Sequence, residues 1–312
     1  MRKISILYLF IAALLISSCV SKKQKENTLS FSGAFALYPL AVKWSEEYQK
    51  EHPDIRFNIS GGGAGKGMAD ALAGAVDLGM FSREISQEEI NQGVWWVGLT
   101  IDAVLPTISE KNPHLGIIQK RGLTKEEFKG IFIDGTITDW SQIVDTPEKL
   151  EIKVYTRSDA CGAAGTWAKY LGGSQENLQG VGVFGDPGLA EVIVNDAAGI
   201  GYNNTVYAYD IKTRQHRPGI VVIPIDINGN GTIDDDEAIY DNYDAVQNGI
   251  ASGKYPSPPA RELYFVSNGR PTKQATLDFL IWTLTEGQKF VEEAGYVTID
   301  NDKINEYIEK LK

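Results

Sequence analysis

The sequence predicts an α/β protein with two lobes that face a shared cleft, and three features carry this prediction. First, predicted strands and helices alternate along residues 28–81, which is typical of a parallel sheet covered by helices. Second, two loops rich in glycine and alanine, at 60–68 and 157–167, each follow a predicted strand and open into a helix. Third, the predicted strands at 99–109 and 261–267 are suited to carry the chain from one lobe to the other and back.

The glycine-rich loop at 60–68 predicts an anion site. Glycine lets the backbone turn its N–H groups inward, and the first N–H groups of a helix lack internal partners while the helix dipole adds positive charge there. Gly63 and Gly65 are therefore candidates for ligand contact. A nucleotide P-loop is excluded, because Gly65-Lys66 lacks both the earlier glycine and the following Ser or Thr. A turn without a ligand remains the alternative.

Residues 1–18 predict a secretory signal. A basic start is followed by an apolar run at 4–16 and then by small residues. The run is shorter than the ~20 residues that a membrane-spanning helix needs. Leu15-Ile16-Ser17-Ser18-Cys19 resembles a bacterial lipobox, so we predict cleavage before Cys19, a lipid on its thiol, and a solvated tether at 19–27. An ordinary signal peptide with a nearby cysteine is the alternative.

Charge and cysteine content narrow the function. The net charge of −11 argues against a nucleic-acid partner. It does not exclude an anionic ligand, since charges more than ~10 Å away are largely screened. With Cys19 lipidated, Cys161 is the only other thiol, so no internal disulfide can form. The remaining chain is long enough for two domains, which we place at 28–105 plus 262–312 (lobe 1) and at 106–261 (lobe 2).

Ser82 and Arg83 follow the predicted strand at 75–81. Open α/β sheets bind ligands at the carboxyl ends of their strands, and the planar fork of arginine suits an oxyanion. We therefore expect Arg83 to contact a ligand. The alternative is a surface arginine paired with Glu84 or Glu88.

Residues 226–237 match the twelve-residue EF-hand calcium loop, with Gly231 at the place of the sharp turn. The predicted calcium ligands are Asp226, Asn228, Asn230, Thr232 through its carbonyl, Asp234 through water, and Glu237. A solvated acidic turn is the alternative. A strand is predicted before the loop, so we expect a structural calcium ion and not a paired helix–loop–helix sensor.

Several motifs, taken in order, resemble the phosphate-binding lipoproteins of bacterial phosphate ABC importers. These motifs are at 32–40, 61–67, 76–84, 123–128 with 131–132 and 138–140, and 198–202, and together they cover nearly the whole mature chain. The resemblance implies the type II periplasmic-binding-protein fold, in which two α/β lobes are joined by a two-strand hinge and hold an anion in the cleft.

The resemblance also implies a function. It predicts a monomeric, non-enzymatic solute-binding lipoprotein, held at the periplasmic or outer face of the envelope by its lipid alone. This protein would capture inorganic phosphate for the permease of an ABC importer. Another oxyanion or a small organic acid on the same fold, or a sensor lipoprotein without transport, stays open. A phosphate-ester hydrolase is the least supported alternative, because the three histidines have no metal-ligand spacing.

Carried onto this chain residue by residue, the family's motifs give a candidate site. Arg83 and Arg157 are expected to neutralise the anion, one from each lobe, and Asp159 to accept the proton of phosphate. The full set of candidate ligand-binding residues is Phe35, Ala36, Gly63, Gly65, Ser82, Arg83, Arg157, Asp159, Cys161, Gly162, Ala163 and Thr166.

Two departures from the family pattern remove hydroxyl groups. The first loop of the family offers a Ser or Thr, whereas Ala34-Phe35-Ala36 offers only backbone N–H groups. Cys161-Gly162-Ala163 stands where the family has Ser-Gly-Thr. Either the second loop is lengthened so that Thr166 serves, or two hydroxyl contacts are lost.

Overall fold

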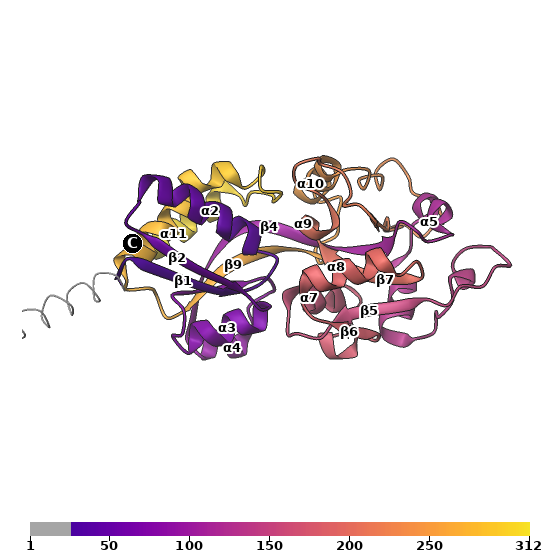
Figure 1. Cartoon of the computed structure of the whole chain (residues 1–312), viewed down its shortest axis with the longest axis horizontal. Helices are drawn as coiled ribbons and strands as arrows, with labels where there is room; N and C mark the ends of the chain where they lie inside the picture. The colour runs from indigo at the N-terminus through magenta and orange to yellow at the C-terminus, as the bar shows by residue number, and fades with distance from the viewer. Residues whose placement is uncertain (1–25) are drawn as a thin grey trace, which may run out of the picture.

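The computed structural model describes residues 26–312, which form two α/β lobes lying side by side (Figure 1). The predicted signal peptide, the lipidated Cys19 and nearly all of the predicted tether fall on residues 1–25, outside the described residues. Within residues 26–312, no helix combines the length and the apolar character needed to span a bilayer.

Lobe 1 is built from the two ends of the described chain. Its elements are β1 (Thr28–Gly33), α2 (Tyr38–Glu51), β2 (Arg56–Gly61), α3 (Ala64–Leu72), β3 (Leu78–Phe81), α4 (Gln87–Asn91), the first part of β4 (Val94–Ser109), β9 (Ala260–Asn268), α11 (Gln274–Leu284), η4 (Glu286–Phe290) and α12 (Asn301–Leu311). The strands run in the order β2-β1-β3-β9-β4, with β1 parallel to β2 and β3. Helices α2 and α11 cover one face of this sheet and α3 covers the other (Figure 1).

Lobe 2 is built from the middle of the chain. It contains the second part of β4, α5 (Leu115–Arg121), α6 (Lys125–Lys129), η1 (Gly130–Asp134), η2 (Trp140–Gln142), β5 (Lys153–Arg157), α7 (Gly162–Tyr170), η3 (Gln175–Asn177), β6 (Val181–Val183), α8 (Gly185–Asn195), β7 (Gly199–Asn204), α9 (Thr205–Ala208), β8 (Ile220–Val222) and α10 (Tyr243–Ala251). Strand β5 lies between β6 and β7 and is parallel to both.

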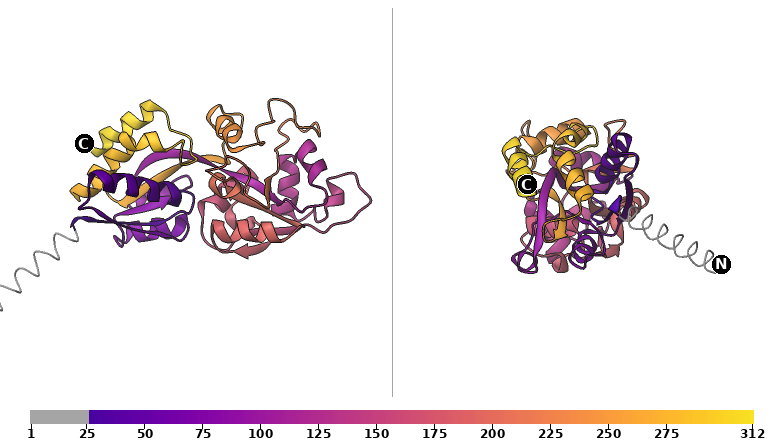
Figure 2. Two further views of the ribbon diagram at one scale, coloured as in Figure 1. Left: turned by 45° about the horizontal axis from the view of Figure 1, so that its top comes forward. Right: turned by 90° about the vertical axis from the view of Figure 1, so that its left-hand side faces the viewer.

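Two neighbouring strands connect the lobes. Residues 94–103 of β4 pair with β9 in lobe 1, and residues 104–109 pair with β7 and β8 in lobe 2. Strand β4 therefore belongs to both sheets, and β9 lies beside it at the crossing, as the rotated view in Figure 2 shows. The predicted lobe boundaries, at 105/106 and 261/262, fall inside these two strands.

Aromatic residues fill the core of lobe 1. The predicted apolar face of α2, with Leu40, Trp44 and Tyr48, is buried as expected from its helical spacing. Phe31 of β1 stacks on Phe279 of α11, with ring centres 5.3 Å apart, so the two ends of the described chain share one core.

Two helices differ from what their sequence pattern indicates. The helical pattern at 272–293 is divided, because α11 ends at Leu284 and a short 3-10 helix follows at Glu286–Phe290. The helix predicted from Trp167 begins five residues earlier, at Gly162. Cys161 is its N-cap, and the sulfur accepts the N–H of Ala164 over 3.4 Å, a capping role that the sequence analysis did not assign to cysteine.

Candidate functional site

The two predicted anion loops lie in direct contact across the lobes. The N–H of Gly65, in the first turn of α3, donates to the carbonyl oxygen of Ala160 over 2.9 Å. Gly63 has φ +84°, and a Cβ added there would lie 2.6 Å from Oδ2 of Asp159. Only glycine permits this approach. The structure is therefore a closed arrangement of the lobes.

A second glycine contact lies beside the first. A Cβ added at Gly162, the first residue of α7, would lie 2.1 Å from the carbonyl oxygen and 2.2 Å from Oγ of Ser82. Ser82 directly follows β3 of lobe 1. We call the group formed by Gly63, Gly65, Ser82, Asp159, Ala160 and Gly162 the inter-lobe seam.

Arg157, at the end of β5, is the central charge beside the seam. Its side chain is 0% exposed. Nε and Nη2 donate to the two oxygens of Asp159 over 2.8 and 2.6 Å, and Nη1 donates to Asp186 over 2.5 Å. Burial alone would lower the pKa of Arg157, but the Asp186 and Asp159 carboxylates raise it above its usual value. The guanidinium is therefore charged and held in one orientation.

Phe35, in the first loop of lobe 1, also reaches across to lobe 2. Its ring lies 5.8 Å from the guanidinium carbon of Arg157 and packs edge-on against Phe184. Its carbonyl oxygen accepts the hydroxyl of Tyr207 over 3.3 Å. Within the described chain, the backbone N–H groups of Phe35 and Ala36 have no acceptor, so both can serve a ligand.

The second predicted anion loop leads directly into α7. Because α7 begins at Gly162, the N–H groups of Gly162 and Ala163 lie at the helix start, where an anion is favoured. Thr166 is buried one turn farther along α7, away from the helix start. A ligand role for Thr166 stays a prediction. Burial raises the pKa of the Cys161 thiol to about 12, so the thiol is protonated at neutral pH and is not a nucleophile.

Arg83 is held by its own lobe. Its Nη2 and Nη1 donate to the two oxygens of Glu89 over 2.7 and 3.1 Å, and its guanidinium lies over the ring of Phe81. Glu89 also caps α4 by accepting the N–H of Ser86. The alternative interpretation of Arg83 is an ion pair with Glu84 or Glu88. An ion pair is present, but its partner is Glu89, which the capping box holds next to Arg83. No contact joins Arg83 to Arg157 among residues 26–312, and a ligand role for Arg83 stays a prediction.

Sequence reasoning missed the partners that lie far along the chain. Asp186, at the start of α8, and Asn204, at the end of β7, are both buried and are joined by a hydrogen bond of 2.5 Å. Arg261 on β9 donates to the carbonyl oxygen of Ser82. No local motif marks these residues. The available signal was weaker: Asp186 is an acidic residue in the first turn of a helix, and Arg261 lies at the start of a strand-like segment that follows two prolines.

The loop at 226–237 folds around its acidic side chains. Asp226 accepts the N–H groups of Gly229 and Gly231 over 2.7 and 2.9 Å, and Glu237 accepts the N–H of Ile227 over 2.8 Å. Asp234 accepts both amide groups of Asn228 and Asn230. Across the described residues, no group of three or more His, Cys, Asp and Glu alone is placed to hold a metal. A cation here would also need amide and carbonyl oxygens, which hard ions accept.

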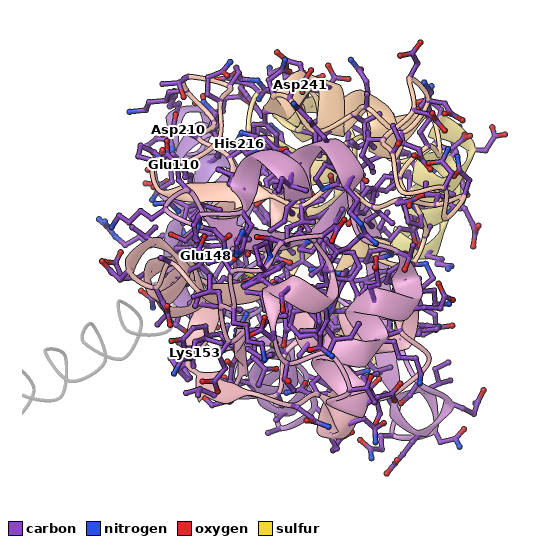
Figure 3. All side chains as sticks on the ribbon, turned by 90° about the vertical axis from the view of Figure 1, so that its right-hand side faces the viewer. Glu110, Glu148, Lys153, Asp210, His216 and Asp241 are labelled. Carbon is purple, nitrogen blue, oxygen red and sulfur yellow. The ribbon has the colours of Figure 1, made fainter. Side chains whose placement is uncertain are left out.

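Among the described residues, the contacts of His216 include no residue of the inter-lobe seam. His216 stacks on Tyr209 with ring centres 4.5 Å apart. Figure 3 shows it near Glu110, Asp210 and Asp241. Burial lowers the pKa of His216, although Asp241 and Glu110 partly oppose this shift.

Comparisons with known proteins agree with this architecture. A family model described as a PBP superfamily domain matches residues 20–286. The phosphate-binding protein PstS of Bacillus subtilis is 24% identical over 291 residues, covering 92% of this chain and 86% of PstS. PstS of Methanocaldococcus jannaschii is 25% identical and covers 95% of this chain and 91% of its own.

A solved structure gives the same picture of the fold. A phosphate ABC transporter substrate-binding protein from Clostridium perfringens, with bound phosphate, superimposes with a TM-score of 0.72 at 20% identity, covering 88% of this chain and 100% of that chain. The predicted two-lobed fold is thereby confirmed. The family model spans most of the chain, and the protein therefore belongs to the PBP superfamily, with the type II periplasmic-binding-protein fold.

Proposed function

We propose that this protein is an extracytoplasmic solute-binding protein that captures phosphate and delivers it to the permease of an ABC importer. The observation that carries the proposal is the buried Arg157, held by Asp159 and Asp186 beside the inter-lobe seam. The start of α7 adds the N–H groups of Gly162 and Ala163, and lobe 1 adds those of Phe35 and Ala36. The predicted contacts through Gly63 and Gly65 are not available in this arrangement, because their N–H groups donate to the carbonyl oxygens of Gly33 and Ala160. The names of the PstS relatives support the choice of ligand. The protein binds and releases its ligand and is not an enzyme.

Asp159 favours phosphate over sulfate. Phosphate keeps a proton at neutral pH and can donate it to a carboxylate, whereas sulfate has no proton to donate. Oδ1 of Asp159 accepts both Nε of Arg157 and the N–H of Gly185, whereas Oδ2 accepts only Nη2 of Arg157 and retains a further lone pair for the phosphate proton. The same charge repels an unprotonated oxyanion. A phosphate site can therefore work here without the hydroxyl groups that this chain lacks.

Calorimetric titration of the mature chain, stripped of ligand, with phosphate and then sulfate tests the proposal. We expect tight binding of phosphate and little heat with sulfate. Asp159→Asn should weaken phosphate binding and narrow the difference between the two ions, because the proton acceptor is lost. The matched control Asp134→Asn changes an exposed aspartate paired with Lys129 and should leave both titrations unchanged. No heat with phosphate would refute the ligand and direct the search to other oxyanions and small acids.

We propose that the protein works as a monomer anchored to the cell envelope by a lipid on Cys19. The lipobox-like sequence supports this anchor. Mass spectrometry of the protein extracted from the membrane fraction should show a mature chain that begins at Cys19 and carries the lipid there. A mature chain that begins at another residue, or a Cys19 without lipid, would contradict the anchor.

We also propose a structural calcium ion in the loop at 226–237. The oxygen side chains at the EF-hand places and the left-handed Gly231, with φ +77°, support it. Asp226 and Glu237 are both buried, and a cation would compensate the cost of burying two carboxylates in one loop. Direct titration with calcium, monitored by calorimetry, tests the site. Absence of binding in wild type, matching an Asp226→Asn control, would contradict it.

A further inference from the structure

Arg261 lies on β9, one of the two strands that join the lobes, and its guanidinium contacts both lobes. Its Nε donates to the carbonyl oxygen of Ser82, after β3 of lobe 1, over 2.7 Å. Its Nη2 donates to Oδ1 of Asn204, at the end of β7 in lobe 2. Asp102, its register partner on β4, lies 3.6 Å from Nη2. One planar group thus holds the backbone of one lobe and a side chain of the other.

The same network continues to the candidate anion site. The amide group of Asn204 donates to Oδ1 of Asp186 over 2.5 Å. The other oxygen of Asp186 accepts Nη1 of Arg157. Because the Asn204 oxygen accepts from Arg261 while its nitrogen donates to Asp186, the amide has one defined orientation. Arg261 and Arg157 are therefore linked through one amide and one carboxylate.

The buried ion pair of Arg261 and Asp102 is poorly suited to raising the free energy of unfolding. The side chain of Arg261 is 6% exposed, and among the described residues its Nη1 and Oδ2 of Asp102 have no hydrogen-bond partner. Burial lowers the pKa of Arg261 and raises that of Asp102, because it opposes both charges. Buried ion pairs of this kind can often be replaced by apolar residues without loss of stability. A role in fixing one conformation explains the arrangement better.

We propose that Arg261 is a positioning residue for the bound anion, which bridges Ser82 and Asn204 in the closed form and thereby fixes the orientation of Arg157. Rotation about the hinge changes the distance between Ser82 and Asn204, so one rigid guanidinium cannot hold both when the lobes are open. The inference rests on the proposed function, because it assigns the oxyanion to Arg157.

Arg261→Lys tests this bridge, because lysine keeps the charge and removes the planar fork. We expect the dissociation constant for phosphate to rise roughly 10- to 100-fold, the scale of a lost charge-assisted hydrogen bond. The dissociation rate should carry most of this change, because the bridge exists only in the closed form. The matched control Arg121→Lys alters an arginine paired with Glu127 in lobe 2 and should leave affinity and rates unchanged. An Arg261→Lys variant with the affinity and dissociation rate of wild type would overturn the proposal.

Asn204→Ala provides a second variant if Arg261→Lys does not fold. It leaves Arg261 on Ser82 but removes the link to Asp186, so it should also speed phosphate release. Release as slow as in wild type would contradict the link. Small-angle X-ray scattering without ligand separates this inference from the proposed function. If wild type binds no phosphate, the proposed function fails, while a smaller radius of gyration for wild type than for the variants still supports the bridge. Equal radii would contradict it.

Discussion

Replacing Gly162 with alanine should prevent full closure of the lobes without unfolding either one. The new Cβ would lie 2.1 Å from the carbonyl oxygen, 2.2 Å from Oγ and 2.5 Å from the carbonyl carbon of Ser82. Ordinary contacts of this kind are well beyond 3 Å, so Ser82 and α7 must move apart by about 1 Å. The backbone of Gly162 is helical and accepts alanine without strain. The conflict therefore exists only when the lobes meet.

The loss of affinity follows from this displacement. A donor at 2.8 Å from an oxygen that retreats by about 1 Å no longer makes a hydrogen bond. Each bond lost to a charged ligand weakens binding by about 1.5–3 kcal/mol. With at least one donor from lobe 1 displaced, we expect the dissociation constant for phosphate to rise by at least about tenfold.

Calorimetric titration of wild type, Gly162→Ala and the control Gly116→Ala measures this effect. Gly116 lies in α5 with open space around its Cβ position, so its substitution should be silent. Thermal unfolding of all three proteins should be similar, because the clash is relieved by opening. Wild-type affinity in Gly162→Ala would refute the reasoning, since it would mean that ligand is held without contact between Gly162 and Ser82.

Three further predictions concern charge, pH and metal. Arg157→Met should lower the free energy of unfolding by about 3–5 kcal/mol, because it leaves two buried carboxylates unpaired. In urea unfolding, adding Asp159→Asn and Asp186→Asn should restore most of this stability but not phosphate binding. Recovery of phosphate binding would contradict the role of Arg157. Because burial lowers the pKa of His216 from 6.5, the unfolded chain takes up a proton first as the pH falls, so stability is complete above pH 6.5 and declines below it, by at most about 1.4 kcal/mol per pH unit. His216→Phe should flatten this slope between pH 7 and 5, and an unchanged slope would exclude His216 as its source. Chelation of calcium should lower the melting temperature through the loop at 226–237, and an unchanged temperature with no metal bound would exclude the ion.

The parts of the site that the sequence predicted are those made by local chemistry. The capping box of Thr124 and Glu127 in α6, outside the site, is local in the same way, because both partners lie within one helical turn. The glycine-rich loop contacts lobe 2, because Gly63 and Gly65 have no Cβ atoms to collide with Asp159 and Ala160. Arg83 was harder to place, because its position after a strand fits either a ligand or a nearby carboxylate. Ser86 with Glu89 forms a capping box that could have been recognised, and it places the competing carboxylate.

The distant partners could not be predicted in the same way. Asp186 lies 29 residues beyond Arg157, and Arg261 reaches Ser82 across 179 positions of sequence. The sheet order, in which β9 lies between β3 and β4, brings Arg261 to Ser82, and the packing of α8 against β5 brings Asp186 to Arg157. The early start of α7 was missed for another reason. Cysteine is not among the preferred N-cap residues, and here Cys161 itself has the extended backbone of an N-cap, which lets its sulfur accept the Ala164 N–H.

The path of the chain through β4 and β9 has a consequence for how the protein is made. Lobe 2 is one uninterrupted segment, whereas lobe 1 is assembled from a first piece and a last piece. Phe31, near the start of lobe 1, packs on Phe279, which emerges from the ribosome after all of lobe 2. Closing so long a loop is slow compared with forming local contacts. Lobe 2 can therefore form its hydrophobic core during synthesis or export. Lobe 1 can fold only after the carboxyl-terminal strand and helices have been synthesised.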